Sequence, residues 1–138
     1  MAEVSALEVR ETRATALGEA EAYMSHSYCD HRLAPEDETD AVDFRHRRMR
    51  LGGCGFNFLQ YGHEVSVSSR GFEEFYMLEM PVAGGVDIVF GAETVRSAPG
   101  RALILSPGPK FRSRWRLGTQ QWMLQIARPL VEARLAEL

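Results

Sequence analysis

Residues 74–109 read EFYMLEMPVAGGVDIVFGAETVRSAPGRALILSPGP, and this segment decides the fold. Short apolar runs recur within it, and glycine or proline separates most of them from the next. Because these two residue types mark tight turns, the pattern predicts several short strands, as in a compact β-sandwich or barrel. The segment contains no catalytic signature, so it indicates a fold rather than a reaction.

Similar strands are predicted on both sides of this segment. The expected strands occupy residues 44–51, 56–61, 64–68, 75–80, 86–90, 93–96, 102–105, 111–117 and 122–127. A set of about nine short strands is typical of a double-sheet jelly roll. The sequence therefore predicts a mainly β barrel or sandwich over residues 44–127.

A helix is predicted before the strands, over residues 14–28. Thr15 can cap it, and Glu19 and Glu21 lie in its early turns, where the helix dipole favours acids. Residues 1–13 show no regular pattern. The acid-rich residues 30–43 are expected to form an exposed connection.

A second helix is predicted to start at residues 129–138, with Pro129 in its first turn. An apolar stripe recurs along it at helical spacing and is expected to face a second copy of the chain, although packing against its own barrel is the alternative. The stripe consists of Leu130, Val131, Leu135 and Leu138. Because it reaches the last residue without a stop signal, we expect the chain to be part of a longer one.

The composition is that of an ordinary globular domain. The chain has 138 residues, of which 45% are hydrophobic and 25% charged, so one domain is expected. Its apolar runs are far shorter than the roughly 20 residues that cross a bilayer, and no signal peptide is evident, so a cytoplasmic protein is predicted. A net charge of -3 does not suit a nucleic-acid-binding domain. Cys29 and Cys54 lack metal-ligand spacing and are expected to be reduced thiols.

Several short landmarks follow one another along the chain: His31-Arg32-Leu33, Leu59-Gln60-Tyr61-Gly62, residues 76–80 before Pro81, Pro99-Gly100-Arg101-Ala102, Leu105-Ser106-Pro107-Gly108 and Ile126-Ala127-Arg128. In their order and spacing they resemble the N-terminal effector-binding and dimerisation domain of AraC/XylS-type transcriptional regulators. The resemblance implies a cupin-like barrel that holds a small effector, a C-terminal helix that contributes to a homodimer, and a separate DNA-binding domain. No helix-turn-helix pattern occurs within these 138 residues, so DNA binding is expected only through a domain outside this chain.

A ligand pocket inside the barrel is the main functional prediction, because small barrels lined by apolar and aromatic side chains are common small-molecule sites. The candidate ligand-binding residues are Phe56, Phe58, Gln60, Tyr61, Tyr76, Leu78, Ile88, Trp122 and Arg45. Trp115 and Leu124 are further lining candidates, and Asn57 and Gln125 are further polar ones. Alternation along a strand shows two faces but does not show which face encloses the cavity.

The expected effector is a small organic acid or an aromatic compound. Arg45 and Arg47 could clamp a carboxylate through bidentate hydrogen bonds. Exposure of these arginines on an edge strand explains them equally well.

The rival hypothesis is a stand-alone cupin enzyme that uses a divalent metal. The four histidines, His26, His31, His46 and His63, contain no closely spaced pair, so no metal or other cofactor is predicted. Ser106 lies outside any nucleophile elbow, and the glycine pairs precede no helix, so neither a hydrolase nor a phosphate loop is indicated. A third hypothesis is a pure dimerisation module whose barrel is filled by its own side chains.

Overall fold

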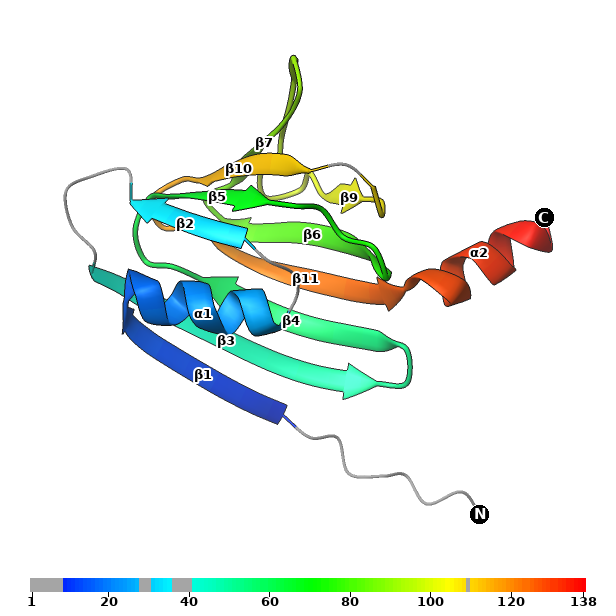
Figure 1. The fold of residues 1–138 in the computed structure, drawn as a ribbon, viewed down its shortest axis with the longest axis horizontal. Helices are drawn as coiled ribbons and strands as arrows, with labels where there is room; N and C mark the ends of the chain where they lie inside the picture. Colours follow the sequence, from blue (N-terminus) through cyan, green and yellow to red (C-terminus); the bar gives the residue numbers. More distant parts are fainter. Residues whose placement is uncertain (1–8, 28–30, 36–40, 109) are drawn as a thin grey trace.

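The computed structural model describes residues 9–27, 31–35, 41–108 and 110–138 of the chain (Figure 1). Eleven strands and two helices occur in these residues. In chain order they are β1 (Val9–Ala16), α1 (Leu17–Ser27), β2 (His31–Pro35), β3 (Ala41–Leu51), β4 (Cys54–Gln60), β5 (Val65–Ser69), β6 (Phe75–Ala83), β7 (Val86–Phe90), β8 (Glu93–Arg96), β9 (Leu103–Leu105), β10 (Phe111–Trp115), β11 (Gln120–Ala127) and α2 (Arg128–Ala136).

The strands form two antiparallel sheets. The six-stranded sheet has the order β1-β3-β4-β11-β6-β9, and the five-stranded sheet has the order β2-β5-β10-β7-β8. The chain passes repeatedly from one sheet to the other, which is the connectivity of a jelly roll. The predicted mainly β, double-sheet architecture with a helix at each end is confirmed.

The core lies between the two sheets. Inward-facing side chains alternate with outward-facing ones, so that Phe75 and Met77 of β6 are buried while Tyr76 and Leu78 are only partly covered. The fully buried residues of the core include Phe44, Leu59, Met77, Val86 and Ile88. Burial of each large apolar side chain stabilises the fold by about 1.5–3 kcal/mol.

Helix α1 covers the side of the barrel where β1, β2 and β3 lie (Figure 1). Leu17, Ala20 and Met24 follow one another at spacings of three and four residues and are buried. A helix with one such apolar face is held by tertiary packing rather than by its intrinsic propensity. α1 therefore links the two sheets from outside.

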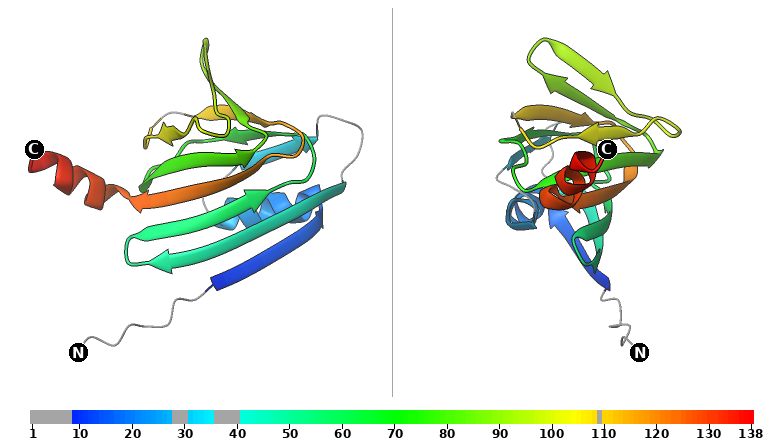
Figure 2. Two further views of the ribbon diagram at one scale, coloured as in Figure 1. Left: turned by 180° about the vertical axis from the view of Figure 1, so that it is seen from behind. Right: turned by 90° about the vertical axis from the view of Figure 1, so that its right-hand side faces the viewer.

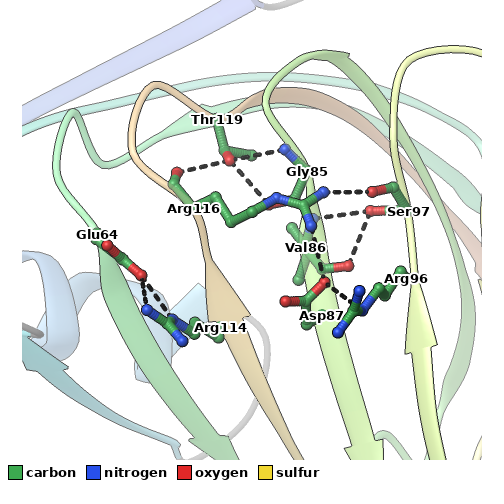
Figure 3. A network of polar contacts seen from close by, with 9 residues as sticks. All are labelled: Glu64, Gly85, Val86, Asp87, Arg96, Ser97, Arg114, Arg116 and Thr119. Atoms are coloured by element: carbon green, nitrogen blue, oxygen red, sulfur yellow. Dashed lines mark hydrogen bonds and ion pairs between the residues drawn. The ribbon is translucent and has the colours of Figure 1, made fainter.

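The turn between β6 and β7 is held by a network of polar contacts (Figure 3). Gly85 N–H donates to Thr119 Oγ1 at 3.0 Å, and Arg116 donates to Asp87 Oδ1 at 3.0 Å and to the Ser97 carbonyl at 2.9 Å. Gly84 has φ +67°, which explains a glycine at this position. The prediction that Gly84 and Gly85 form a turn is confirmed.

Two strands lie where none was predicted. β1 occupies residues for which the sequence predicted either no regular structure or the beginning of the helix. The helix α1 therefore runs over Leu17–Ser27 rather than over residues 14–28. β2 lies within residues 30–43, the predicted exposed connection. The barrel thus begins at Val9 rather than at residue 44. Both are edge strands with few buried side chains, chiefly Ala14 in β1 and Leu33 in β2, so they lack the alternation that marks a half-buried strand.

Helix α2 begins immediately after β11 and extends away from the barrel (Figures 1 and 2). Pro129 lies in its first turn, as predicted, and no residue of α2 is buried. Within the described parts of the chain, no helix is long and apolar enough to cross a membrane.

Candidate functional site

A cavity of about 40 Å³ lies between the sheets. One water molecule needs about 10–15 Å³ of such volume, so the cavity has room for about three water molecules. Residues from both sheets, the loops and α1 line it: Met24, Leu59, Tyr61, Val67, Ser69, Phe72, Met77, Glu79, Phe111, Ser113, Trp115 and Met123. Most of this lining is apolar, so its few polar groups identify what the cavity could bind.

Glu79 is the charged residue of this lining. It shares the inner face of β6 with Phe75 and Met77, is only 5% exposed, and its Oε2 has no hydrogen-bond partner among the described residues. Burial raises the pKa of the Glu79 carboxyl to about 7, and the neighbouring Gln121 amide acts in the opposite direction. A carboxyl with such a pKa changes its protonation state near neutral pH.

Gln121 lies on the inner face of β11, diagonally across from Glu79. It is fully buried, and neither its Oε1 nor its Nε2 makes a hydrogen bond of good geometry within the described structure, although its amide is close enough to affect Glu79. Each buried polar atom without a partner costs about 1–3 kcal/mol. Such groups are rare in folded proteins and call for an explanation, of which a missing ligand is one.

A second polar cluster ties α1 to the six-stranded sheet. Tyr23 Oη lies 2.7 Å from His46 Nδ1, and His46 Nε2 lies 3.2 Å from Asn57 Oδ1. Because Asn57 Nδ2 donates to the carbonyls of Gly55 and Met123, its Oδ1 must accept, which assigns the proton to His46 Nε2 and makes Nδ1 the acceptor for Tyr23. Burial, together with the nearby charge of Arg48, lowers the pKa of His46 to about 4, while the hydrogen bond to Asn57 acts in the opposite direction.

The predicted ligand-binding residues separate into two groups. Tyr61 lines the cavity, as does Trp115, and Ile88 is fully buried in the core. The other aromatic and aliphatic candidates lie on the outer face of the six-stranded sheet, outside the cavity: Phe56, Phe58, Tyr76, Leu78, Leu124 and Trp122.

The expectation that this outer group lines the interior is wrong. Phe56 is 39% exposed and Trp122 46% exposed, and the ring of Trp122 packs edge-to-face on Phe58 at 5.1 Å. The inner positions of the same strands carry polar residues such as Asn57 and Gln121. These strands thus carry apolar side chains on both faces, and some of their inner positions are polar. Hydrophobicity alone therefore indicated the wrong face.

Gln60 and Arg45 also lie outside the cavity. Gln60 Nε2 donates to Asp43 and its Oε1 accepts from Gln120 Nε2 at 3.2 Å, while Arg45 Nε lies 3.3 Å from Asp43 Oδ1. β3 pairs with β1 as well as with β4, so Arg45 occupies the solvent face of an internal strand rather than an edge. Gln125 is half-buried and likewise absent from the lining.

The side chains of the predicted dimer stripe are accessible. Leu130 is 51% exposed, Leu135 58% and Leu138 94%, and Val131 is half-buried. Their contact with a second chain stays a prediction.

The described residues do not offer the donor set of a metal-dependent cupin. They contain no group of three or more His, Cys, Asp or Glu placed to hold one ion. Both ring nitrogens of His46 are engaged by Tyr23 and Asn57. Cys54 is a free thiol, while Cys29 and the side chain of His31 lie outside the described residues.

Two sheets closed around a small interior cavity define a cupin-like barrel domain. The chain matches the model of the AraC-binding-like domain over residues 20–137, and it belongs to that family. The resemblance inferred from the sequence is thereby confirmed. No curated protein matches the chain.

Solved structures support the same fold. The crystal structure of the AraC-like transcriptional activator CuxR is similar with a TM-score of 0.80 and 13% identity, covering 94% of this chain and 51% of that one. The Schizosaccharomyces pombe Cnp3 cupin domain has a TM-score of 0.50 and 14% identity, with coverages of 69% and 71%. A protein of unknown function from Rhizobium leguminosarum bv. viciae 3841 has a TM-score of 0.50 and 15% identity, with coverages of 83% and 96%. The chain spans about half the length of the CuxR chain.

Proposed function

We propose that this chain is the sensing and dimerisation domain of an AraC/XylS-type transcriptional regulator that acts in the cytoplasm. A small effector binds inside the barrel and controls a helix-turn-helix domain that lies outside this chain. The observation that carries the proposal is a cavity bordered by Glu79 in a member of the AraC-binding-like family. The Oε2 atom of Glu79 and both amide atoms of the neighbouring, buried Gln121 lack hydrogen-bond partners among the described residues. We propose no reaction, because no set of described residues combines a nucleophile, a base and a substrate cleft.

Both helices are connected to the cavity. Met24 of α1 lies in the cavity wall, and the preceding residue, Tyr23, is bonded to His46 of the sheet. β11 carries Gln121 and Met123 and continues directly into α2. An effector regulates only as far as it binds one arrangement of the domain better than another, so these two connections are the routes by which occupancy would reach a partner domain.

The proposal is tested by a thermal-shift screen of small metabolites against the wild type and a variant with a filled cavity. Ser113 lies in the cavity lining, and Ser113→Leu adds apolar atoms there. At least one compound is expected to raise the Tm of the wild type but not that of Ser113→Leu, since a ligand that binds only the folded state stabilises it. Arg45→Ala, outside the cavity, is the control and should respond like the wild type. A screen without any stabilising compound, or equal shifts in all three proteins, would contradict binding inside the barrel.

A further inference from the structure

The described wall of the interior cavity has one acidic group and no basic group. Its described lining contains Glu79 and no lysine, arginine or histidine. An acidic effector, which Arg45 was expected to bind, would therefore meet a carboxyl group rather than a guanidinium group inside the barrel. This charge distribution limits the chemical class of the effector.

The rest of the wall favours a cation. Tyr61 and Trp115 meet edge-to-face with centroids 4.9 Å apart, and Phe72 and Phe111 contact each other at 5.5 Å. All four rings border the cavity. The faces of aromatic rings attract cations, and such rings recur in proteins that bind organic ammonium groups.

The buried polar atoms of Glu79 and Gln121 that lack hydrogen-bond partners also favour a cationic ligand. An ionised carboxylate is stable inside a protein only when it is paired and hydrogen-bonded, and the described structure supplies Glu79 with only the amide of Gln121. A protonated nitrogen carries several N–H donors and a positive charge. It can therefore donate hydrogen bonds to Glu79 Oε2 and Gln121 Oε1 together and also balance the charge of the carboxylate. A neutral hydroxyl can donate but cannot balance that charge. An anion can do neither.

We propose that the effector presents a protonated nitrogen group, an ammonium or an amidinium, to Glu79 of the cavity wall, beside the buried amide of Gln121. The assignment rests on the proposed function, because it concerns the same cavity. Room for about three waters accommodates such a head group and a short stem. Met24, Met77 and Met123 in the wall are unbranched and adapt to a larger ligand.

An outer cleft is an alternative binding site, and it suits a ligand of the opposite charge. It has a volume of about 440 Å³ and is bordered by Arg32, Arg70 and Lys110, together with Glu21 and three serines. An anionic ligand would find its complement there rather than in the barrel. The two sites can be told apart by where a bound molecule perturbs the protein.

The experiment is a titration followed by NMR of protein labelled with ¹³C in the methionine methyl groups. The probes are n-propylamine, n-propanol and propionate, which are similar in size and differ in charge. Propylamine is expected to shift the Met77 and Met123 signals saturably, and propanol to bind at least tenfold more weakly. Glu79→Gln should weaken propylamine binding at least tenfold, whereas Glu132→Gln, on exposed α2, should not.

Four results would overturn the assignment. Propanol binding as tightly as propylamine, or undiminished propylamine binding to Glu79→Gln, would remove the charge requirement while leaving an effector site in the barrel. Propionate binding in place of propylamine would show that the effector is an anion. Unchanged Met77 and Met123 signals with all three probes would also reject the assignment, and the metabolite screen would then decide separately whether the barrel binds any effector.

Discussion

Glu79 influences the stability of the fold. Its carboxyl has a pKa of about 7 in the folded protein, against an ordinary value of 4.5. Between these two pH values the folded state holds a proton that the unfolded state has lost. Stability therefore falls as the pH rises from about 4.5 to about 7, by on the order of 3 kcal/mol.

The variant Glu79→Gln is expected to remove this pH dependence. Its free energy of unfolding should exceed that of the wild type by an amount that grows from pH 4.5 to pH 7 and is constant above it. Urea unfolding at pH 4.5, 6 and 8 measures the difference. A difference independent of pH would show that Glu79 is not buried as described.

His46 has the opposite effect on how stability depends on pH. Its pKa is about 4 in the folded protein and 6.5 ordinarily, so in this range the unfolded state binds the extra proton and stability falls as the pH drops. The slopes from His46 and Glu79 offset each other between about pH 4.5 and 6.5 in the wild type. Glu79→Gln should therefore also reveal a rise in stability with pH over that range.

Tyr23→Phe tests the link between α1 and the sheet. The change removes the 2.7 Å hydrogen bond to His46 Nδ1 and leaves that buried nitrogen without this partner. A loss of about 1–2 kcal/mol in the free energy of unfolding is expected. Tyr76→Phe is the matched control on the outer face and should change stability by less than about 0.5 kcal/mol. Equal effects of the two substitutions would mean that the Tyr23–His46 bond contributes nothing.

The sequence predicted only part of the candidate site. It indicated Tyr61, which lines the cavity, but not Glu79 or Gln121, because apolar alternation does not point to buried polar residues. A signal existed for Glu79. In the run FYMLEMP, a period of two places Glu79 on the same face as Phe75 and Met77, so one face of an apolar strand carries a lone acid.

Turns and apolar runs explain why the elements from residue 44 onward were predicted well. Glycine and proline at the ends of β6, β7 and β9 mark boundaries that local chemistry dictates. β1 and β2 depend instead on pairing with β3 and β5, which are distant in sequence. Such pairing leaves little trace in the local sequence, because backbone hydrogen bonds do not depend on the side chain.

Gly84→Ala tests the turn between β6 and β7. Gly84 has φ +67°, and a Cβ there would lie within 3 Å of Thr119 backbone atoms. A loss of at least about 2 kcal/mol is expected from backbone strain and the clash. Gly18→Ala is the control, since Gly18 lies in α1 with open space around its Cα, and it should be neutral or stabilising by up to about 1 kcal/mol. A stable Gly84→Ala protein would contradict the described turn.

In the whole molecule, α2 stands out as the helix that has no buried residue. It projects from the barrel with Leu130, Leu135 and Leu138 exposed (Figure 1). Pairing of this helix with its copy across a two-fold axis would bury the stripe of both chains at once. The barrel needs no contribution from α2 to complete its core.

The proposed dimer is tested by size-exclusion chromatography with light scattering. The wild type is expected to be dimeric at high micromolar concentration, and Leu135→Glu to be monomeric with an unchanged circular dichroism spectrum, because Leu135 is 58% exposed in the single chain. Arg134→Gln, on the same helix, is the control for a general effect of charge. A monomeric wild type would reject the dimer.

Binding of the effector inside the barrel is tested by hydrogen–deuterium exchange with and without the most stabilising compound from the metabolite screen. Slower exchange is expected in β6 and β11, which carry Glu79 and Gln121, together with a change in α1, which carries Met24. Protection confined to the outer cleft around Arg32, Arg70 and Lys110, with β6, β11 and α1 unchanged, would contradict it.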